Sequence, residues 1–188
     1  MIRSEQLSQL QNTQEWDVII IGGGASGLGT AIDAASRGYK TILLEAVDFA
    51  KGTSSRSTKL VHGGVRYLEE GNIHLVREAL KERGLMLQNA NHLVKNQSFV
   101  IPNYHWFGGY FYTFGLKIYD LLSGRLSLGS SKYLSKKKTI ELLPNVEENG
   151  LKNGVIYHDG QFDDSRLAVN MAQTAVENGA CILNYVKV

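Results

Sequence analysis

The sequence predicts an α/β fold built around a parallel sheet, and three observations indicate it. Residues 18–21 (Val-Ile-Ile-Ile) form a continuous β-branched run, which we expect to be a strand buried on both faces. Glycines follow at positions 22, 23, 24 and 27, and residues 26–37 form a helix of small residues that stops at Gly38. Residues 41–44 (Thr-Ile-Leu-Leu) are a second buried strand, so a strand–helix–strand unit opens the chain.

The composition is typical of an ordinary α/β enzyme. Hydrophobic residues make up 43% of the 188 residues, which is enough to build a core. Charged residues make up 20%, a share that fits a folded enzyme better than a disordered chain. A formal net charge of +2 gives no reason to expect a nucleic-acid partner. Cys181 is the single cysteine, so an internal disulfide is excluded, and we expect it to be a small buried hydrophobe. The histidines show no metal-ligand spacing, and no metal site is predicted.

The remaining elements follow from hydrophobic periodicity and from stop signals. Aspartates cap a helix over 164–178 that Gly179 ends, and Pro102 and Pro144 end the elements before them. The other predicted elements are a helix over 72–91, a strand over 98–101, a short helix over 139–143, and strands over 155–157 and 181–188. Residues 1–15 are polar and lack the apolar stretch of a signal peptide, and no run is long enough to span a membrane.

The glycine cluster forms a predicted cradle for a pyrophosphate. Residues 22–27 match G-x-G-x-x-G between a strand and a helix, the context of a Rossmann-like dinucleotide site. Gly22 permits a tight turn, Gly24 lets the backbone approach the phosphates, and Gly27 lets the helix pack closely. The helix N-terminus offers free N–H groups to the phosphates. Glu45, at the end of the second strand, is placed to accept ribose hydroxyls and to repel a 2′-phosphate, which argues against NADP.

Residues 53–68 decide between FAD and NAD, which share this cradle. An NAD dehydrogenase of the common kind would continue into another strand–helix unit here. Instead the segment holds hydroxyl side chains, a Gly63-Gly64 pair, and the basic residues Lys59, His62 and Arg66, with little periodicity. Such a segment suits an extended ligand, with hydroxyls along phosphate and ribityl oxygens, glycines against a flat ring, and cations for an anionic substrate or a reduced flavin. The sequence therefore predicts FAD.

Five short strings carry a resemblance to a known family. They are the cradle, residues 43–46 (Leu-Leu-Glu-Ala), 53–55 (Thr-Ser-Ser), 57–69 and 163–167 (Asp-Asp-Ser-Arg-Leu). The most specific part is 59–68, Lys-Leu-Val-His-Gly-Gly-Val-Arg-Tyr-Leu. Over residues 16–188 the chain resembles the FAD-dependent, quinone-linked glycerol-3-phosphate dehydrogenases, within the glycine-oxidase-like group of FAD-dependent oxidoreductases.

This resemblance implies an organisation and a reaction. The fold would be a Rossmann-like FAD-binding domain with a parallel sheet and part of a mixed α+β substrate domain. Residues 1–15 would be a polar extension, 16–95 and 163–188 parts of the FAD-binding domain, and 96–162 a partial substrate domain. The reaction would be oxidation of sn-glycerol 3-phosphate to dihydroxyacetone phosphate, with electrons passed to quinone or, in oxidase relatives, to oxygen. The chain is expected to be an incomplete N-terminal fragment of a cytoplasmic protein, or of one peripheral to the inner membrane face.

The resemblance also implies site residues. Two are catalytic candidates: His62 as the base that takes the hydroxyl proton, and Arg66 as a ligand of the substrate phosphate. For His62 a packing or flavin-contacting role is the favoured alternative, and for Arg66 the alternative is a surface ion pair. Cofactor binding is implied for Gly22, Gly24, Ala25, Ser26, Gly27, Glu45, Ala46, Thr53, Ser54, Ser55, Lys59, His62, Gly63, Gly64 and, through its backbone at the adenine, Val188.

Two further questions stay open at the level of the sequence. The aromatic stretch 106–114, with Lys132 and Lys136–Lys138 nearby, suits either membrane contact or a helix packed inside the substrate domain, and packing is favoured. The alternative functions are another FAD-dependent amino-acid or 2-hydroxy-acid oxidase, or an inactive FAD-binding fragment. In the isolated chain we expect an open sheet edge or face, and therefore association and weak FAD binding.

Overall fold

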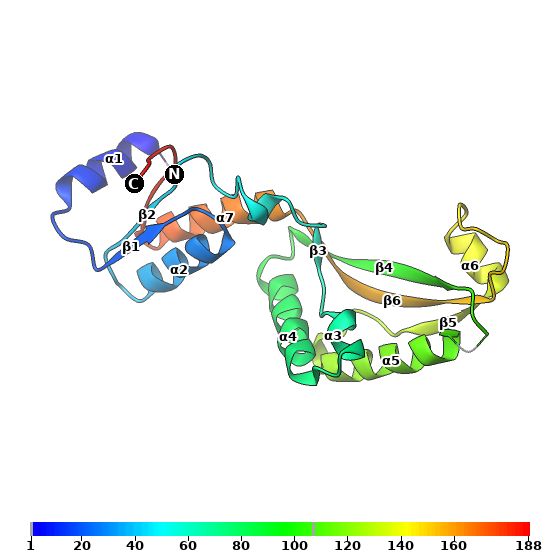
Figure 1. Ribbon diagram of the computed structural model, residues 1–188. Helices are drawn as coiled ribbons and strands as arrows, with labels where there is room; N and C mark the ends of the chain where they lie inside the picture. The colour runs from blue at the N-terminus through cyan, green and yellow to red at the C-terminus, as the bar shows by residue number, and fades with distance from the viewer. Residues whose placement is uncertain (1, 107) are drawn as a thin grey trace. The chain divides into compact units, whose positions relative to one another are not determined.

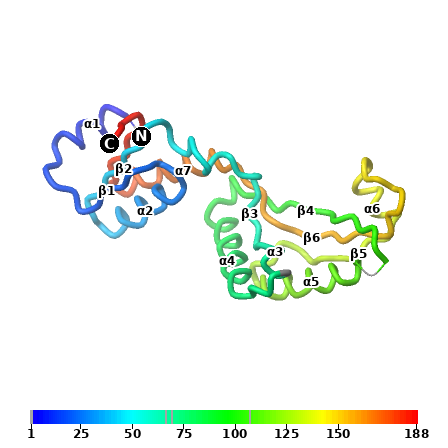
Figure 2. The backbone as a smooth tube through the Cα atoms, in the orientation of Figure 1, coloured from blue at the N-terminus to red at the C-terminus, as the bar shows by residue number. Residues whose placement is uncertain are grey.

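The computed structural model describes residues 2–106 and 108–188, and within these ranges every side chain except those of Arg66 and Glu69. The chain forms two compact units: unit 1 comprises the residues up to Lys59 together with Asp163–Val188, and unit 2 comprises Leu60–Phe162. The tube in Figure 2 follows the chain out of unit 1, through unit 2 and back, so that both termini belong to unit 1. The functional domain boundaries expected from the resemblance stay a prediction.

Unit 1 is a parallel sheet between helices. Strands β1 (Val18–Ile21), β2 (Thr41–Leu44) and β7 (Cys181–Leu183) lie in the order β1-β2-β7, and both pairings are parallel (Figure 1). Helices α2 (Ala25–Ser36) and α7 (Asp164–Glu177) pack against each other over one face, and short side chains such as Ala31 and Ala172 bring them close. The Rossmann-like parallel sheet predicted from the sequence is therefore confirmed.

The other face of this sheet is covered by a helix that sequence patterning did not indicate. Helix α1 (Arg3–Asn12) packs against β7, where Leu10 joins the cluster of Ile42, Cys181 and Leu183. The side chain of Gln6 is buried, and its amide oxygen accepts a hydrogen bond of 2.7 Å from the backbone N–H of Ile182. A polar N-terminal segment thus becomes helical because tertiary contacts satisfy its buried polar groups.

The expectation that β1 is buried on both faces is wrong. Its residues alternate between half-buried and exposed, and the side chains of Ile19 and Ile21 are 61% and 71% exposed. Ile20 faces the helices and packs against the core of α2 and α7. The reason is that β1 is an edge strand, and α1 covers the second face at β7 instead. An open apolar face, as expected for the isolated chain, is present at β1.

The last predicted strand is shorter than its apolar pattern suggested. Strand β7 ends at Leu183 instead of continuing to Val188. Tyr185 has a positive φ of 55°, and the chain turns back so that its N–H donates to the carbonyl of Val47 and that of Val186 to Glu45. Cys181 is buried as predicted, and burial raises the pKa of its thiol to about 11, so the thiol is protonated near neutral pH.

Unit 2 contains an antiparallel sheet with helices on one side. Strand β6 (Asn153–Phe162) pairs with β4 (Val94–Asn103) along its whole length, and with β3 (Leu60–Val61) and β5 (Lys132–Ser135). Pro102 does not end the strand as expected, since β4 continues to Asn103. The reason is that β4 is an edge strand, where a missing N–H leaves no partner unsatisfied.

Four helices accompany this sheet. Helices α3 (Val65–Glu69), α4 (Ile73–Asn89) and α5 (Gly108–Ser123) lie along one side of it, and α6 (Lys136–Leu142) lies at the far end of β6 (Figure 1). The core between the helices contains Val76 and Leu80 of α4 and Tyr119 of α5. Two single 3-10 turns, η1 (Thr53–Ser55) and η2 (Gly124–Leu126), complete the described elements. Among residues 2–106 and 108–188, no helix is both long and apolar enough to cross a bilayer.

Helix ends were the most predictable local features. Asn72 accepts a hydrogen bond from the N–H of Leu75 at the start of α4, and Asp163 accepts one from Arg166 at the start of α7. Gly38 and Gly179, the two predicted stops, have φ of 86° and 95°. The aspartate cap and the two glycine stops are confirmed, whereas the Asn72 cap was not predicted; capping is predictable because it depends on a few neighbouring residues and little on the rest of the fold.

The open face of β1 gives a prediction for the 188-residue chain. Replacing Ile19 and Ile21 together by Thr keeps the β-branched shape but removes exposed apolar surface, so self-association should fall while stability changes by less than about 0.5 kcal/mol. The matched control is Ile20→Thr, which faces the helices and should cost about 1–3 kcal/mol. Light scattering and urea unfolding measure the two effects. A double variant as destabilised as the control would mean that this face is covered.

Candidate functional site

The glycine turn between β1 and α2 is a close backbone contact. Gly22 has a φ of 108°, in the region that favours glycine. A Cβ added at Gly27 would lie 2.0 Å from the carbonyl oxygen of Gly22, so any side chain there would displace the turn. Gly24 is the N-cap of α2 and offers no side chain to the first helical N–H groups. The turn therefore leaves the N-terminus of α2 available to a group with negative charge.

Ser54 lies at this helix N-terminus. Its hydroxyl oxygen accepts a hydrogen bond of 2.9 Å from the backbone N–H of Ala25, and a Cβ on Gly24 would come within 3.1 Å of it. The 3-10 turn of Thr53, Ser54 and Ser55 is thus brought beside the cradle, although nearly 30 residues of sequence separate them. The prediction that this segment and the cradle serve one ligand is consistent with that contact.

Glu45 connects the end of β2 to the same turn. One carboxylate oxygen accepts a hydrogen bond of 2.7 Å from the N–H of Gly23, and the other accepts one of 2.8 Å from the N–H of Val47. Both bonds orient the carboxylate at the carboxyl end of the sheet, next to the cradle. This is the position from which an acidic residue accepts ribose hydroxyls in nucleotide sites of this kind. Ala46, which follows it, is exposed.

Two expected cofactor residues have different surroundings. Lys59 has a φ of 63°, and its ammonium donates to the carbonyl of Ser55 at 2.8 Å and forms a short ion pair with Asp164. Its charge is therefore compensated inside unit 1. Val188 is 73% exposed and lies outside β7, five residues beyond its end. Neither observation tests a contact with a cofactor.

Asp164 is the anchor that sequence reasoning assigned only to helix capping. Its side chain is almost completely buried and accepts hydrogen bonds from the N–H and hydroxyl of Ser57 as well as from Lys59. The hydrogen bond from Lys59 is the main reason that the pKa of the Asp164 carboxyl lies well below its ordinary value of 3.8, and Ser57 lowers it further. Asp164 begins the helix that follows the return of the chain to unit 1, and its carboxylate thus holds the last residues before the chain leaves that unit.

The His-Gly-Gly segment lies in unit 2, on the surface of a pocket. His62 is exposed, and with Gly64, Tyr67, Phe99 and Tyr157 it lines a concave pocket of about 470 Å³. The rings of Phe99 and Tyr157 contact each other with centroids 5.4 Å apart. Gly64 has a φ of 72°, and a Cβ there would collide with the ring of Tyr67. The pocket combines aromatic walls with an imidazole at its edge.

A buried polar network fixes Gly63 beside this pocket. The N–H of Gly63 donates to the hydroxyl of Tyr119 at 2.7 Å, and that hydroxyl donates to Asp159 at 3.0 Å. The other oxygen of Asp159 accepts a bond of 2.9 Å from Arg83, and Tyr119, Asp159 and Arg83 are each at most 2% exposed. Burial is the main cause that raises the pKa of Tyr119, so the phenol keeps its proton. A Cβ at Gly63 would lie 2.2 Å from Leu80, so only glycine fits.

Sequence reasoning missed this network, although one signal was present. Arg83 occupies the apolar stripe of α4, at helical spacing from Val76 and Leu80, so a charge there requires a buried acid. Nothing in the sequence shows that the acid is Asp159, 76 residues later. Arg66, from the same motif as Gly63, is the second residue of helix α3, but its side chain lies outside the described part of the chain.

Comparison with known proteins adds the family to this geometry. The family model described as FAD dependent oxidoreductase matches residues 17–188. The chain belongs to the FAD-dependent oxidoreductase family. The expected family is therefore confirmed, and with it FAD as the cofactor of that family. The cradle fits this cofactor, because its glycine-only contact, the exposed start of α2 and Glu45 provide the parts that an adenine dinucleotide requires.

Several relatives are similar over nearly the whole chain. The mitochondrial glycerol-3-phosphate dehydrogenase of Rattus norvegicus is 46% identical over 193 residues, 99% of this chain and 26% of that protein. The Saccharomyces cerevisiae enzyme of the same name is 48% identical over 99% of this chain and 30% of its own length. A solved glycerol-3-phosphate dehydrogenase from Bacillus halodurans, complexed with FAD, matches with a TM-score of 0.71 and 34% identity over 99% of this chain and 29% of that chain. The chain thus spans less than a third of these relatives.

The pKa of Asp164 gives a prediction with a defined sign. Because the folded-state pKa is lowered, the carboxylate stabilises the fold fully above its ordinary pKa of 3.8, and this stabilisation is lost as the pH falls below it. Asp164→Asn should therefore lower the free energy of unfolding at pH 7, and the gap to the parent should shrink between about pH 5 and pH 3. Urea unfolding across that range measures it.

The matched control is Asp163→Asn, one residue earlier. Asp163 is exposed and caps α7 by accepting from Arg166, a role that Asn fulfils equally well, so this variant should change little at any pH. A pH-independent difference between Asp164→Asn and the parent would contradict the ion-pair explanation.

Proposed function

We propose that this chain is part of a FAD-dependent glycerol-3-phosphate dehydrogenase, which oxidises sn-glycerol 3-phosphate to dihydroxyacetone phosphate. The observation that carries the proposal is the sequence of residues 59–68. It is supported by relatives named glycerol-3-phosphate dehydrogenase, whose similarity extends over 99% of this chain. The direct test is dye reduction by the full-length protein with glycerol 3-phosphate, compared with amino acids and 2-hydroxy acids. Faster reduction with one of the latter would favour the alternative oxidase.

Unit 1 supplies the residues that hold the cofactor in this proposal. The start of α2 at Ala25 and Ser26 faces the pyrophosphate, and the glycines of the turn allow it to approach. The N–H of Ser26 donates to the phosphates, while that of Ala25 donates to the Ser54 hydroxyl beside them. Glu45 accepts the hydroxyls of the adenosine ribose, and the Thr53–Ser55 turn follows the phosphates. FAD, when bound, supplies an acceptor for the two electrons of an alcohol oxidation. Residues 16–95 and 163–188 then serve FAD binding, and 96–162 the substrate.

Unit 2 supplies the residues proposed for the flavin side and the substrate. Gly63 and Gly64 present backbone to the ring, and the Tyr119 hydroxyl holds the first of them in place. His62, exposed at the pocket edge, either takes the hydroxyl proton of the substrate or contacts the flavin. Arg66 is proposed as the phosphate ligand on the basis of the motif, since a guanidinium binds a phosphate with two parallel hydrogen bonds.

The electron acceptor is proposed to be a quinone, and the protein is proposed to be cytoplasmic and peripheral to the inner membrane face. A quinone dissolved in a bilayer requires that its reductant approach that bilayer. Support comes from the exposed aromatic side chains of α5 and its neighbours, including Trp106 at 74% exposure.

Glu45 provides a test of cofactor binding. In the full-length protein Glu45→Ala should weaken FAD roughly tenfold to a hundredfold, since a charge-assisted hydrogen bond contributes about 1.5–3 kcal/mol. Titration of the apoprotein with FAD, followed by flavin fluorescence, measures it. Glu177→Ala, at the exposed end of α7, is the control and should bind FAD as the parent does. Unchanged affinity in the Glu45 variant would remove the ribose assignment.

Arg66 provides a test of substrate recognition. In the full-length enzyme Arg66→Ala should reduce kcat/KM for glycerol 3-phosphate far more than for glycerol, because only the first substrate carries a phosphate dianion that needs a paired cation. Steady-state dye reduction with both substrates measures the difference, and Arg66→Lys should recover only part of it. Equal losses on both substrates would show that Arg66 does not bind the phosphate.

A further inference from the structure

Helix α1 contacts the rest of unit 1 through a stripe of polar side chains. These side chains recur at every third position and therefore share one face of the helix: Arg3, Gln6 and Gln9. Each forms a hydrogen bond with the segment 179–184, and the partners follow in reverse order: Asn184, Ile182 and Gly179. The helix therefore runs antiparallel to this segment, and these hydrogen bonds add to the packing of Leu10 in attaching it.

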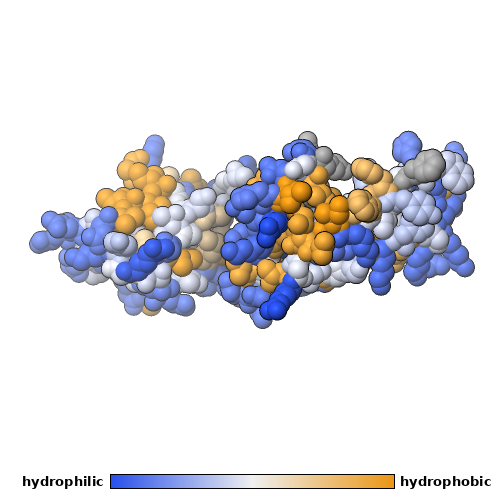
Figure 3. All heavy atoms as spheres, turned by 90° about the horizontal axis from the view of Figure 1, so that it is seen from below, coloured by the Kyte–Doolittle hydropathy of each residue, from blue (hydrophilic) through white to orange (hydrophobic). Residues whose placement is uncertain are grey.

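The opposite side of α1 is polar as well. Glu5 and Ser8 are exposed there, and the end of unit 1 at the left of Figure 3 is largely hydrophilic. A polar helix of this length has little stability by itself in water, so its contacts with the protein must hold it in place. The polar stripe that contacts the segment 179–184 is thus a specific attachment, and its position near the carboxyl end of β7 gives it a possible role at the cofactor site.

The segment that α1 holds is bonded in turn to the backbone of Glu45. The N–H of Glu45 donates to the carbonyl of Leu183 at 2.8 Å, and its carbonyl accepts from the N–H of Val186 at 2.9 Å. Two residues further along, the carbonyl of Val47 accepts from the N–H of Tyr185 at 2.9 Å. Both backbone groups of Glu45 are therefore fixed from the end of β7. The direction of its carboxylate depends on these bonds, because a side chain is placed only as accurately as the backbone that carries it.

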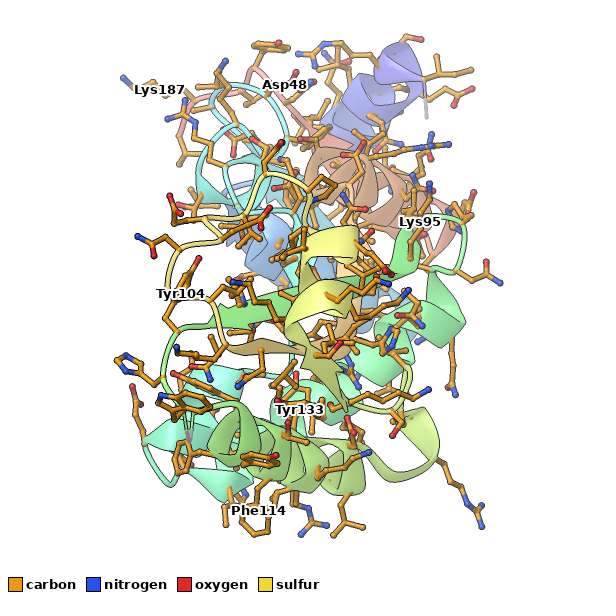
Figure 4. The ribbon with its side chains drawn as sticks, turned by 90° about the vertical axis from the view of Figure 1, so that its right-hand side faces the viewer. Asp48, Lys95, Tyr104, Phe114, Tyr133 and Lys187 are labelled. Atoms are coloured by element: carbon orange, nitrogen blue, oxygen red, sulfur yellow. The ribbon has the colours of Figure 1, made fainter. Side chains whose placement is uncertain are left out.

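A side-chain contact makes a second connection at the exposed edge of unit 1. The amide of Asn184 donates to the carboxylate of Asp48 at 2.9 Å, while Arg3 donates to Asn184 at 2.8 Å. The hydrogen bond from Asn184 is the main reason that the pKa of the Asp48 carboxyl lies below its ordinary value of 3.8. Two residues later the N–H of Ala50 donates to the carbonyl of Gly23 in the cradle at 2.8 Å. Figure 4 shows Asp48 at the upper edge of unit 1, level with α1.

These contacts connect a helix outside the family pattern to the nucleotide site. The family model matches residues 17–188, so α1 precedes it. A helix that only covered the sheet would need Leu10, but not the exposed hydrogen bonds of Arg3, which shield no apolar surface. A carboxylate that is held in its binding orientation before the ligand arrives loses less conformational entropy on binding, and the affinity rises accordingly.

We propose that α1 is a positioning element of the cofactor site. Arg3 and Gln6 raise the affinity for FAD by fixing the segment that orients Glu45, although neither residue touches the cofactor. The adenosine half of FAD is the part that depends on α1, because Glu45 accepts the hydroxyls of its ribose. This inference rests on the proposed function for the ribose assignment of Glu45 and for nothing else.

The experiment is titration of the full-length apoprotein with FAD and, separately, with ADP, which probes the adenosine half alone. Arg3→Ala with Gln6→Met should raise both dissociation constants by the same factor, about threefold to tenfold, because hydrogen bonds that fix Glu45 are lost. Arg3→Ala alone, at an exposed residue, should produce part of the rise, and Arg3→Lys should recover part of that. The matched control is Arg37→Ala, which removes an exposed ion pair with Asp33 on α2 and should bind both ligands as the parent does.

The same substitutions in a Glu45→Ala background separate positioning from general weakening. If α1 acts through the carboxylate of Glu45, the two effects should not add, because little remains for α1 to orient. Equal factors in both backgrounds would overturn the proposal, since α1 would then only stabilise the sheet. Parental affinity in the Arg3 and Gln6 double variant would overturn it as well. If that double variant does not fold, Arg3→Ala decides by the same comparison.

Dye reduction with glycerol 3-phosphate, measured on the same proteins, keeps this inference apart from the proposed function. A parent that reduces no dye, but whose affinity for FAD depends on α1 and Glu45 together, would refute the proposed reaction and leave the role of α1 standing. Weak FAD binding in Glu45→Ala combined with parental binding in the α1 variants would have the opposite meaning. The ribose assignment would then stand, and the positioning role of α1 would be wrong.

Discussion

The contact between Gly27 and the carbonyl of Gly22 is the constraint on which unit 1 depends. It allows α2 to start directly after β1, since a single Cβ at Gly27 would lie 2.0 Å from that oxygen. The helix then begins at the carboxyl end of the sheet, where Glu45 from the neighbouring strand and Ser54 from the following loop reach it by hydrogen bonds. This close contact produces a nucleotide cradle, because the N-terminus of α2, the Glu45 carboxylate and the Ser54 hydroxyl all meet at the same edge of the sheet.

The buried carboxylate of Asp164 has a comparable importance for the connection of the chain. Unit 2 is inserted between Lys59 and Asp163. The segment by which the chain leaves unit 1 and the segment by which it returns must therefore be held together. Asp164 does this within unit 1 by binding Ser57 and Lys59, the last residues before the insertion. An ion pair at such a position compensates a charge that would otherwise be buried alone, which is the condition under which a buried carboxylate is tolerated.

Helix α5 of unit 2 is apolar on both its inner and its outer side. On its inner side α5 provides Tyr119, which connects Gly63 to the buried pair of Asp159 and Arg83 and so fixes a segment of the family motif. On its outer side the same helix carries the exposed phenylalanines.

The sequence by itself determined the local elements and the cofactor class. The parallel strands, the helix α2, the cap of α7 and the glycine cradle all follow from short-range patterns, because capping, turns and strand propensity depend on neighbouring residues. Only the tertiary structure decided which faces are covered and which charges are paired. Ile19 has the sequence context of a buried strand residue but is exposed on an edge strand. Helix α1 packs against β7 although its polar sequence has no apolar stripe that would predict this contact. Lys59 and Asp164, or Arg83 and Asp159, are partners across 105 and 76 residues. Such pairs cannot be found from spacing in the sequence, because they are set by which elements the folded chain brings together.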